Sequence, residues 1–118
     1  MSQKILIVDD AVVDRQNLER ILAAAGHFVL LAESGEQALV RAKNDKPDLI
    51  LMDVNMPELD GFATTRRLKA DAATRDIPVV FVTGKNQKAD LAWGRMLGAR
   101  GYVAKPYTPE QILAQVGA

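Results

Sequence analysis

The 118-residue chain contains no cysteine and only one histidine, and both shortages limit the chemistry that it can perform. Without cysteine it can form neither disulfides nor thiolate metal sites, and a single histidine excludes a histidine-rich zinc site. Its 15 Lys and Arg residues balance 15 Asp and Glu residues, so the formal net charge is zero. Because no excess of positive charge attracts nucleic acid, we expect no direct binding of DNA or RNA.

The chain also lacks a long hydrophobic run. No apolar stretch approaches the ~20 residues that cross a bilayer, and residues 1–4 lead directly into a strand pattern rather than a signal peptide. We therefore expect a cytoplasmic protein without membrane insertion. The length fits a single domain, residues 1–118, and 48% hydrophobic with 25% charged residues is ordinary for a globular fold.

Short apolar runs alternate with segments of helical periodicity along the chain. Runs of four or five apolar residues are too short for buried helices and are typical of strands covered on both faces. Such alternation predicts an α/β fold with five parallel strands, wrapped by five helices, in the natural order 2-1-3-4-5. We expect the strands at residues 4–8, 28–32, 49–52, 79–83 and 101–104.

The intervening segments predict helices with one apolar face each. Ser34 with Gln37 and Thr108 with Gln111 have the spacing of capping boxes, and Pro109 suits a first helical position. A further helix is expected from about residue 62 to 70. The side chains predicted to face the core are Leu18, Ile21, Leu22 and Ala25; Ala38, Leu39 and Ala42; Ala89, Ala92, Trp93, Met96 and Leu97; and Ile112, Leu113 and Val116.

Carboxylates follow two of the predicted strands at the point where each strand ends. Asp53 follows the run at 49–52, and Asp9 and Asp10 follow the first strand. Adjacent parallel strands would bring all three to one edge of the sheet, where open α/β sheets bind ligands. Alone, Asp53 would be read as a residue that caps a turn. Three carboxylates so close require compensation, which a divalent cation with oxygen ligands, Mg²⁺, provides most simply.

A lysine completes this edge. Lys105 follows the last predicted strand, which places its ammonium opposite the carboxylates. Acids, Mg²⁺ and a lysine in one place are typical of a phosphoryl-transfer site.

Four motifs, in this order, resemble the receiver domain of bacterial two-component response regulators, and they cover nearly the whole chain. The fold that this implies is the flavodoxin-like, doubly wound sheet. Finer details at Trp93-Gly94 and at residues 98–100 are most similar to stand-alone regulators of chemotaxis or twitching motility. The four motifs are Ile7-Val8-Asp9-Asp10; Met52-Asp53-Val54-Asn55-Met56-Pro57 with Asp60-Gly61; Pro78-Val79 with Val82-Thr83-Gly84; and Gly98-Ala99-Arg100-Gly101-Tyr102 with Lys105-Pro106.

The resemblance implies a role for each acid. Asp53 would be the phosphoacceptor, taking a phosphoryl group from a phosphohistidine of a sensor histidine kinase or phosphotransfer protein. Asp10 and Asp53 would ligate Mg²⁺ directly, the backbone carbonyl of Asn55 would be a third ligand, and Asp9 would act through water. The protein would not otherwise be an enzyme, because its only reactions would be the phosphorylation and dephosphorylation of itself.

The resemblance also implies a switch. Lys105, with a cis bond to Pro106, and the hydroxyl of Thr83 would each contact a phosphoryl oxygen. Thr83 would move toward the phosphoryl group and Tyr102 would rotate into the vacated space, which would change the face formed by the fourth helix, fifth strand and fifth helix. A downstream target protein would bind there. Taken singly, Thr83 and Tyr102 are ordinary strand residues, and core packing is the simpler interpretation of Trp93.

Other classes of protein are compatible with parts of this pattern. A flavin-binding protein of the same strand order is rejected, because Asp9 and Asp10 would repel the phosphate of the cofactor. A Mg²⁺-dependent phosphatase would place an acid two residues after its nucleophile, where Asn55 stands. A receiver without phosphorylation, serving as a passive binding module, and a fragment of a longer regulator remain alternatives. The sequence does not identify the kinase, the target, the oligomeric state or the phosphoryl lifetime.

Overall fold

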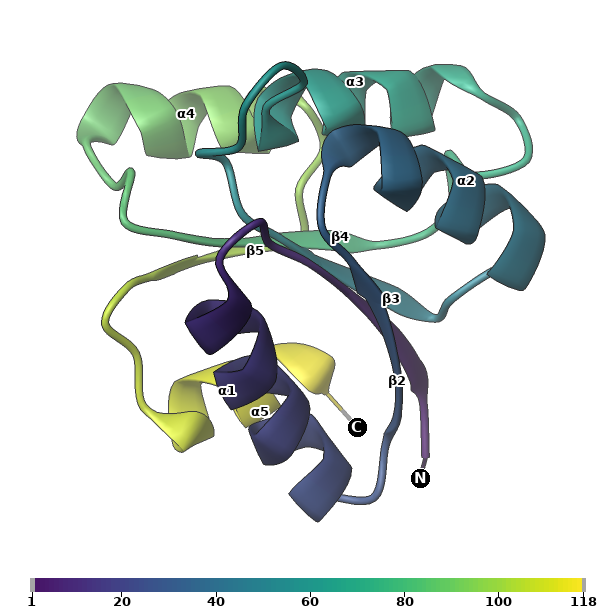
Figure 1. Ribbon diagram of the computed structural model, residues 1–118. Helices are drawn as coiled ribbons and strands as arrows, with labels where there is room; N and C mark the ends of the chain where they lie inside the picture. The colour runs from purple at the N-terminus through teal and green to yellow at the C-terminus, as the bar shows by residue number, and fades with distance from the viewer. Residues whose placement is uncertain (1, 118) are drawn as a thin grey trace.

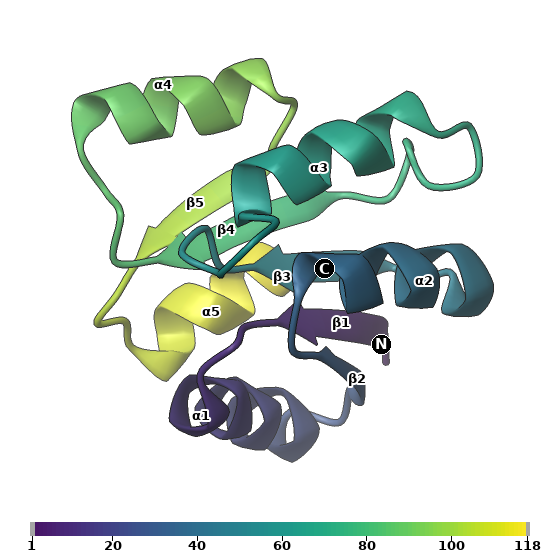
Figure 2. The same cartoon turned by 45° about the horizontal axis from the view of Figure 1, so that its top comes forward.

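The computed structural model describes residues 2–117, and a five-stranded parallel sheet of order β2-β1-β3-β4-β5 forms its centre (Figure 1). The arrowheads of β1, β4 and β5 point the same way in Figure 2. The fold class, the strand order and the bounds of every strand agree with the sequence prediction. The strands are β1 (Lys4–Val8), β2 (Phe28–Ala32), β3 (Leu49–Met52), β4 (Val79–Thr83) and β5 (Gly101–Ala104).

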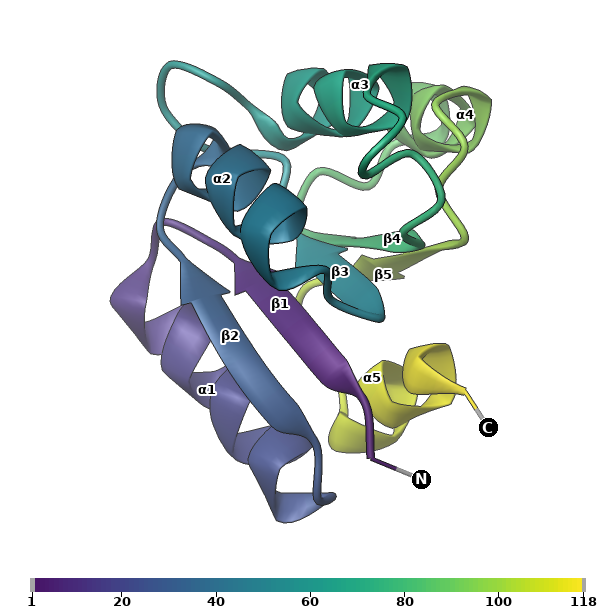
Figure 3. The ribbon, with the colours of Figure 1, turned by 90° about the vertical axis from the view of Figure 1, so that its right-hand side faces the viewer.

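Five helices in the described residues cover both faces of this sheet. Helices α1 and α5 lie on one face, and α2, α3 and α4 lie on the other (Figures 1 and 3). The helices are α1 (Val12–Ala24), α2 (Gly35–Asp45), α3 (Gly61–Ala70), α4 (Lys88–Met96) and α5 (Pro109–Val116). None of them has the length and apolar composition that a membrane crossing requires.

The strands are apolar throughout because each contributes to two cores. Leu6 and Ile50 pack in the cluster under α2, α3 and α4, whereas Ile5 and Leu51 pack in the cluster under α1 and α5. All four side chains are at most 1% exposed. Successive residues of a strand point to opposite faces, so burial on both sides removes the alternation of polar and apolar residues.

The register of the central strands sets the position of the site. Val8 of β1 pairs with Met52 of β3, and the amide of Asp53 donates a 2.9 Å hydrogen bond to the carbonyl of Val8. The residues that follow Val8 and Met52 therefore leave the sheet side by side at the same edge.

The predicted helix starts are largely correct. Thr108 and Gln111 form the expected capping box at Pro109. The Ser34 hydroxyl accepts a 3.1 Å hydrogen bond from the Gln37 amide, but the Gln37 side chain accepts from the amide of Glu33, one residue before the cap. Ser34 and Gln37 therefore do not form the predicted capping box, because Gln37 accepts from the amide of Glu33 and not from that of Ser34.

The predicted core face of α4 is wrong within the helix, although Leu97, directly after it, is partly buried and packs against the core. Trp93 is 38% exposed and Met96 is 76% exposed, and Ala89 and Ala92 are exposed as well. Only Gly94 of this helix is buried. An alanine Cβ at Gly94 would lie 3.1–3.2 Å from the rings of Tyr102 and Phe81, so the helix turns its glycine, not its apolar stripe, toward the sheet.

Two smaller corrections concern the other face of the sheet. Ala25 lies beyond the last residue of α1 and is exposed. Leu113 of α5 is 36% exposed, while Ile112 and Val116 are buried as expected. Leu113 is not part of the core because it borders an open groove between α1 and α5.

Candidate functional site

The three predicted carboxylates meet at the carboxyl edge of the sheet. Asp9, Asp10 and Asp53 each place one carboxylate oxygen within 4.8 Å of the others. Asp9 is 1% and Asp53 is 7% exposed, whereas Asp10 is open to solvent. Hard oxygen ligands, two of them buried and one accessible, fit Mg²⁺, which retains several waters when bound.

Backbone amides orient the two buried acids. Asp9 Oδ1 accepts a 3.0 Å hydrogen bond from the amide of Ala11, and Asp53 Oδ1 accepts a 3.3 Å bond from the amide of Asn55. The second oxygen of each acid, Oδ2, accepts a hydrogen bond from the Lys105 ammonium. Asn55 thus lies directly beside Asp53.

Lys105 reaches the carboxylates from the end of β5. Its Nζ donates to Asp9 Oδ2 at 2.8 Å and to Asp53 Oδ2 at 3.2 Å. The Lys105–Pro106 peptide bond is cis, as the resemblance implied. The ammonium partly compensates the two buried acids, whereas Asp10 forms no ion pair with Lys105.

Asp14 is a site residue that the sequence analysis missed. Its Oδ2 accepts a 3.0 Å hydrogen bond from Lys105 Nζ, so Lys105 holds three acids at once. Asp14 lies in the first turn of α1, where an acid normally interacts with the helix dipole. Its position therefore gave no sign of a contact with Lys105, which is 91 positions away.

Burial and charge act in opposite directions on the central pair. Burial raises the pKa of Asp9, and the hydrogen bonds from Lys105 and Ala11 offset this only in part. Burial alone would lower the pKa of Lys105, but the hydrogen bonds to Asp9 and Asp14 and the charge of Asp53 outweigh it and raise this pKa. Lys105 is therefore protonated at neutral pH, and its stabilising contribution is lost only when the pH rises through its raised pKa. The charge of Asp9 is a cost to folding that acidification relieves.

Thr83 and Tyr102, the predicted switch pair, are linked through one peptide segment. The fully buried Thr83 hydroxyl accepts a 3.2 Å hydrogen bond from the amide of Lys85, and the Tyr102 hydroxyl donates to the carbonyl of Lys85. Burial, followed by the charges of Asp90 and Asp53, raises the pKa of Tyr102 to about 12. The backbone of Lys85 therefore connects the two residues.

A tight loop joins Asp53 to α3. The amide of Gly61 donates to the carbonyl of Val54 at 2.9 Å, and Asp60 caps α3 through a 2.8 Å hydrogen bond from the amide of Ala63. A Cβ at Gly61 would lie 2.8 Å from Val54 Cα and from the carbonyl carbon of Asp53. Only glycine allows the loop to pass so close to the backbone of Asp53.

We expect Gly61→Ala to destabilise the protein by about 2 kcal/mol, because two backbone segments must separate to admit the methyl group. Urea unfolding measures this change. Gly84→Ala is the matched control, since its added Cβ meets no atom within 4 Å, and we expect it to change stability by less than ~0.5 kcal/mol. Equal stability of Gly61→Ala and wild type would contradict the close packing of the loop.

The chain is similar to proteins of one family along almost its whole length. Residues 5–117 match the family model described as response regulator receiver domain. The chain is 45% identical to Protein PilH of Pseudomonas aeruginosa, over 98% of this chain and 95% of that protein. It is 37% identical to the alkaline phosphatase synthesis transcriptional regulatory protein PhoP of Bacillus subtilis, where it spans 48% of the longer protein. The Vibrio cholerae chemotaxis protein CheY4 is structurally similar, with a TM-score of 0.92, 31% identity, and coverage of 98% of this chain and 97% of that one.

The chain belongs to the response regulator receiver domain family. The general function of this family is a phosphorylation-activated signalling switch within two-component systems, not conventional enzymatic catalysis. The similarity to PilH and CheY4 over almost their whole lengths confirms the narrower resemblance to stand-alone regulators. Receiver domains bind Mg²⁺ at a cluster of aspartates, and Asp9, Asp10 and Asp53 form such a cluster here.

Proposed function

We propose that residues 1–118 form one cytoplasmic receiver domain that is phosphorylated on Asp53. The hydrogen-bonded position of Asp53 beside Lys105, 3.2 Å from its ammonium, carries this assignment. The end residues, Met1 and Ala118, lie outside the described structure. The similarity to PilH and to the chemotaxis protein CheY4 supports a signal that serves chemotaxis or twitching motility.

The phosphoryl donor is a histidine kinase or a phosphotransfer protein. A carboxylate oxygen of Asp53 forms the new bond to phosphorus while the phosphorus–nitrogen bond of the phosphohistidine breaks, and the neutral imidazole leaves. Hydrolysis of the resulting acyl phosphate returns the free acid. Asp53 is suited to this attack because one of its oxygens is fixed by the amide of Asn55 while the other faces Lys105.

Asp10, Asp53 and the backbone carbonyl of Asn55 would hold Mg²⁺, with Asp9 acting through water. Bound Mg²⁺ supplies charge neutralisation at the phosphoryl oxygens. Lys105 pairs with one phosphoryl oxygen and the Thr83 hydroxyl donates to another. To do so Lys105 exchanges a carboxylate for the phosphoryl group, and its present hydrogen bond to Asp53 Oδ2 supports this role.

Signal output follows from the link between Thr83, Lys85 and Tyr102. When Thr83 turns toward the phosphoryl group, the amide of Lys85 loses its acceptor and the segment that also holds Tyr102 shifts. The Tyr102 ring lies against Gly94 of α4, so its movement changes the α4–β5–α5 face to which a target protein binds.

Trp93 fluorescence tests this proposal, because Trp93 neighbours Gly94 on α4 and is half-exposed. Beryllofluoride replaces the phosphoryl group on an aspartate. We expect a fluorescence change when beryllofluoride is added to wild type with Mg²⁺, and none in Asp53→Asn or after chelation of Mg²⁺. An equal change in Asp53→Asn would contradict the assignment. No fluorescence change, together with no phosphoryl adduct by intact mass after treatment with acetyl phosphate and Mg²⁺, would favour the passive binding module.

A further inference from the structure

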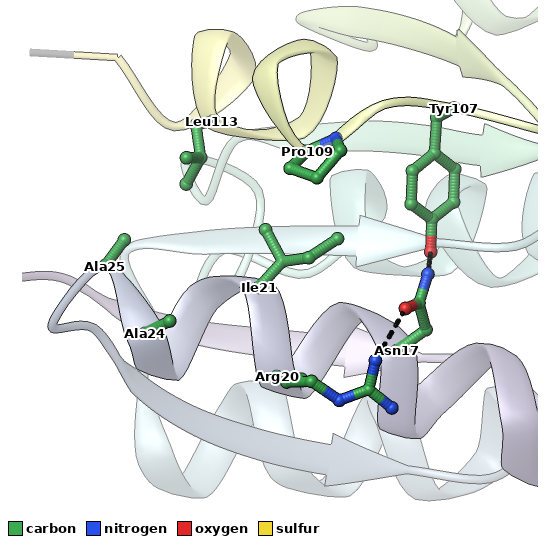
Figure 4. A pocket seen from close by; sticks show the side chains of 8 residues that line it. All are labelled: Asn17, Arg20, Ile21, Ala24, Ala25, Tyr107, Pro109 and Leu113. Atoms are coloured by element: carbon green, nitrogen blue, oxygen red, sulfur yellow. Dashed lines mark hydrogen bonds between the residues drawn. The ribbon is translucent and has the colours of Figure 1, made fainter.

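An open groove lies away from the cluster of acids, between α1 and α5 (Figure 4). Its volume is about 640 Å³, within the range of about 300–1,000 Å³ that is common for small-molecule sites. Asn17, Arg20, Ile21 and Ala24 border it from α1. Their spacing of three and four residues places them on one face of the helix.

The walls of the groove are apolar along most of its length. Ile21, Ala24 and Ala25 line it on the side of α1, and Pro109 and Leu113 line it on the side of α5. The small alanines leave the space open, and this explains why Leu113 is exposed although it lies on the apolar side of α5. An apolar ligand body would remove this surface from water.

The polar groups gather toward one end of the groove and are mainly donors. Tyr107 points from the segment before α5 toward Asn17 (Figure 4), and its hydroxyl accepts a 3.0 Å hydrogen bond from Asn17 Nδ2. The Tyr107 proton is therefore free to be donated. Arg20 donates to Asn17 Oδ1 at 3.2 Å and forms no ion pair with a carboxylate of residues 2–117.

We propose that this groove binds a small organic anion, with its apolar body between α1 and α5 and its carboxylate or similar group at Arg20 and Tyr107. Charge complementarity selects an anion, because Arg20 offers a guanidinium without an acidic partner and Tyr107 offers a hydroxyl proton. Burial raises the pKa of Tyr107, so this proton is retained at neutral pH.

The groove shares two residues with a second cavity that lies beside Lys105. Asn17 and Tyr107 also border a neighbouring cavity that includes Asp14 and Lys105. A bound anion would therefore contact the residues beside the Lys105–Asp14 hydrogen bond of 3.0 Å. If Lys105 leaves Asp14 for a phosphoryl group, the charges beside Asn17 and Tyr107 change. The affinity of the groove for an anion would then depend on phosphorylation, so the two sites would be coupled.

Amide chemical shifts of the ¹⁵N-labelled 118-residue chain test the site with 4-phenylbutyrate and its neutral amide, 4-phenylbutyramide. We expect shifts confined to residues 17–25 and 107–113, and binding of the carboxylate about fivefold tighter than that of the amide. Arg20→Gln removes this preference, and Ala24→Trp fills the groove and abolishes both interactions. Arg66→Gln, which alters an exposed arginine of α3, is the control and leaves both affinities unchanged.

Three results would overturn the proposal. The first is the absence of shifts in the groove, and the second is equal affinity of wild type for the two probes. The third is a shift of the same amides on changing the protein concentration without a probe, because the groove would then bind a second copy of the chain.

The coupling rests on the proposed function and is measured separately. We expect the affinity for 4-phenylbutyrate to change at least about twofold when Mg²⁺ and beryllofluoride are added, and not to change in Asp53→Asn. An unchanged affinity in wild type overturns the coupling. The existence of the binding site is tested separately, by the affinities for the two probes in the absence of beryllofluoride.

Discussion

Asp53→Asn is expected to abolish phosphorylation of the protein while preserving its fold. The amide has nearly the shape of the acid but is a poor nucleophile, so we expect the rate of phosphate incorporation from acetyl phosphate with Mg²⁺ to fall at least ~10³-fold. The substitution also removes one of three neighbouring carboxylates, which relieves repulsion. The free energy of unfolding should therefore be unchanged or higher, as measured with urea.

Asp60→Asn is the matched control for this prediction. Asp60 lies in the same loop, but its carboxylate caps α3 and does not contact Lys105. Asparagine caps helices as well as aspartate does, so this variant should be phosphorylated at close to the wild-type rate. Incorporation of phosphate into Asp53→Asn at the wild-type rate would refute the assignment of the phosphoacceptor.

Lys105→Met is expected to change two properties in opposite directions. Loss of the ammonium removes a stabilising partner of the phosphoryl oxygens, which should slow phosphorylation by ~10²–10³-fold. The same loss leaves Asp9, Asp14 and Asp53 without their shared cation, so Mg²⁺ becomes the main compensating charge and should bind more tightly. Isothermal titration calorimetry and phosphate incorporation measure the two effects.

Lys43→Met controls for the general loss of a positive charge. Lys43 is 63% exposed and its ion pair with Asp71, at 3.8 Å, lies on the surface, where such pairs contribute little. We expect neither Mg²⁺ affinity nor phosphorylation to change by more than about twofold. Weaker Mg²⁺ binding by Lys105→Met would show that Lys105 supports the metal site instead of competing with it.

The sequence predicted the sheet and the acid cluster well for the same physical reason. Parallel strands covered on both faces produce short, uninterrupted apolar runs, and each run here ends at a polar or charged residue. The end of a run is therefore also the edge of the sheet. The positions of Asp9, Asp53 and Lys105 followed from this relation together with the strand order.

Helix faces were predicted less reliably because apolar periodicity does not reveal whether a helix lies flat on a core. Trp93 and Met96 form a regular stripe, yet Gly94 is the only residue of α4 that is buried. Asp14 was missed for a related reason, since its contact with Lys105 depends on the tertiary arrangement. The groove between α1 and α5 likewise depends on the angle between two helices, which spacing within either helix does not encode.

Identification of the phosphorylated residue is the most direct test of the central claim. Wild type is treated with acetyl phosphate and Mg²⁺ and then reduced with borohydride, which converts an aspartyl phosphate to homoserine that peptide mass spectrometry can locate. The proposed mechanism predicts homoserine at position 53 and only when Mg²⁺ was present. Homoserine at position 9 or 10, or at no position in the chain, would contradict it.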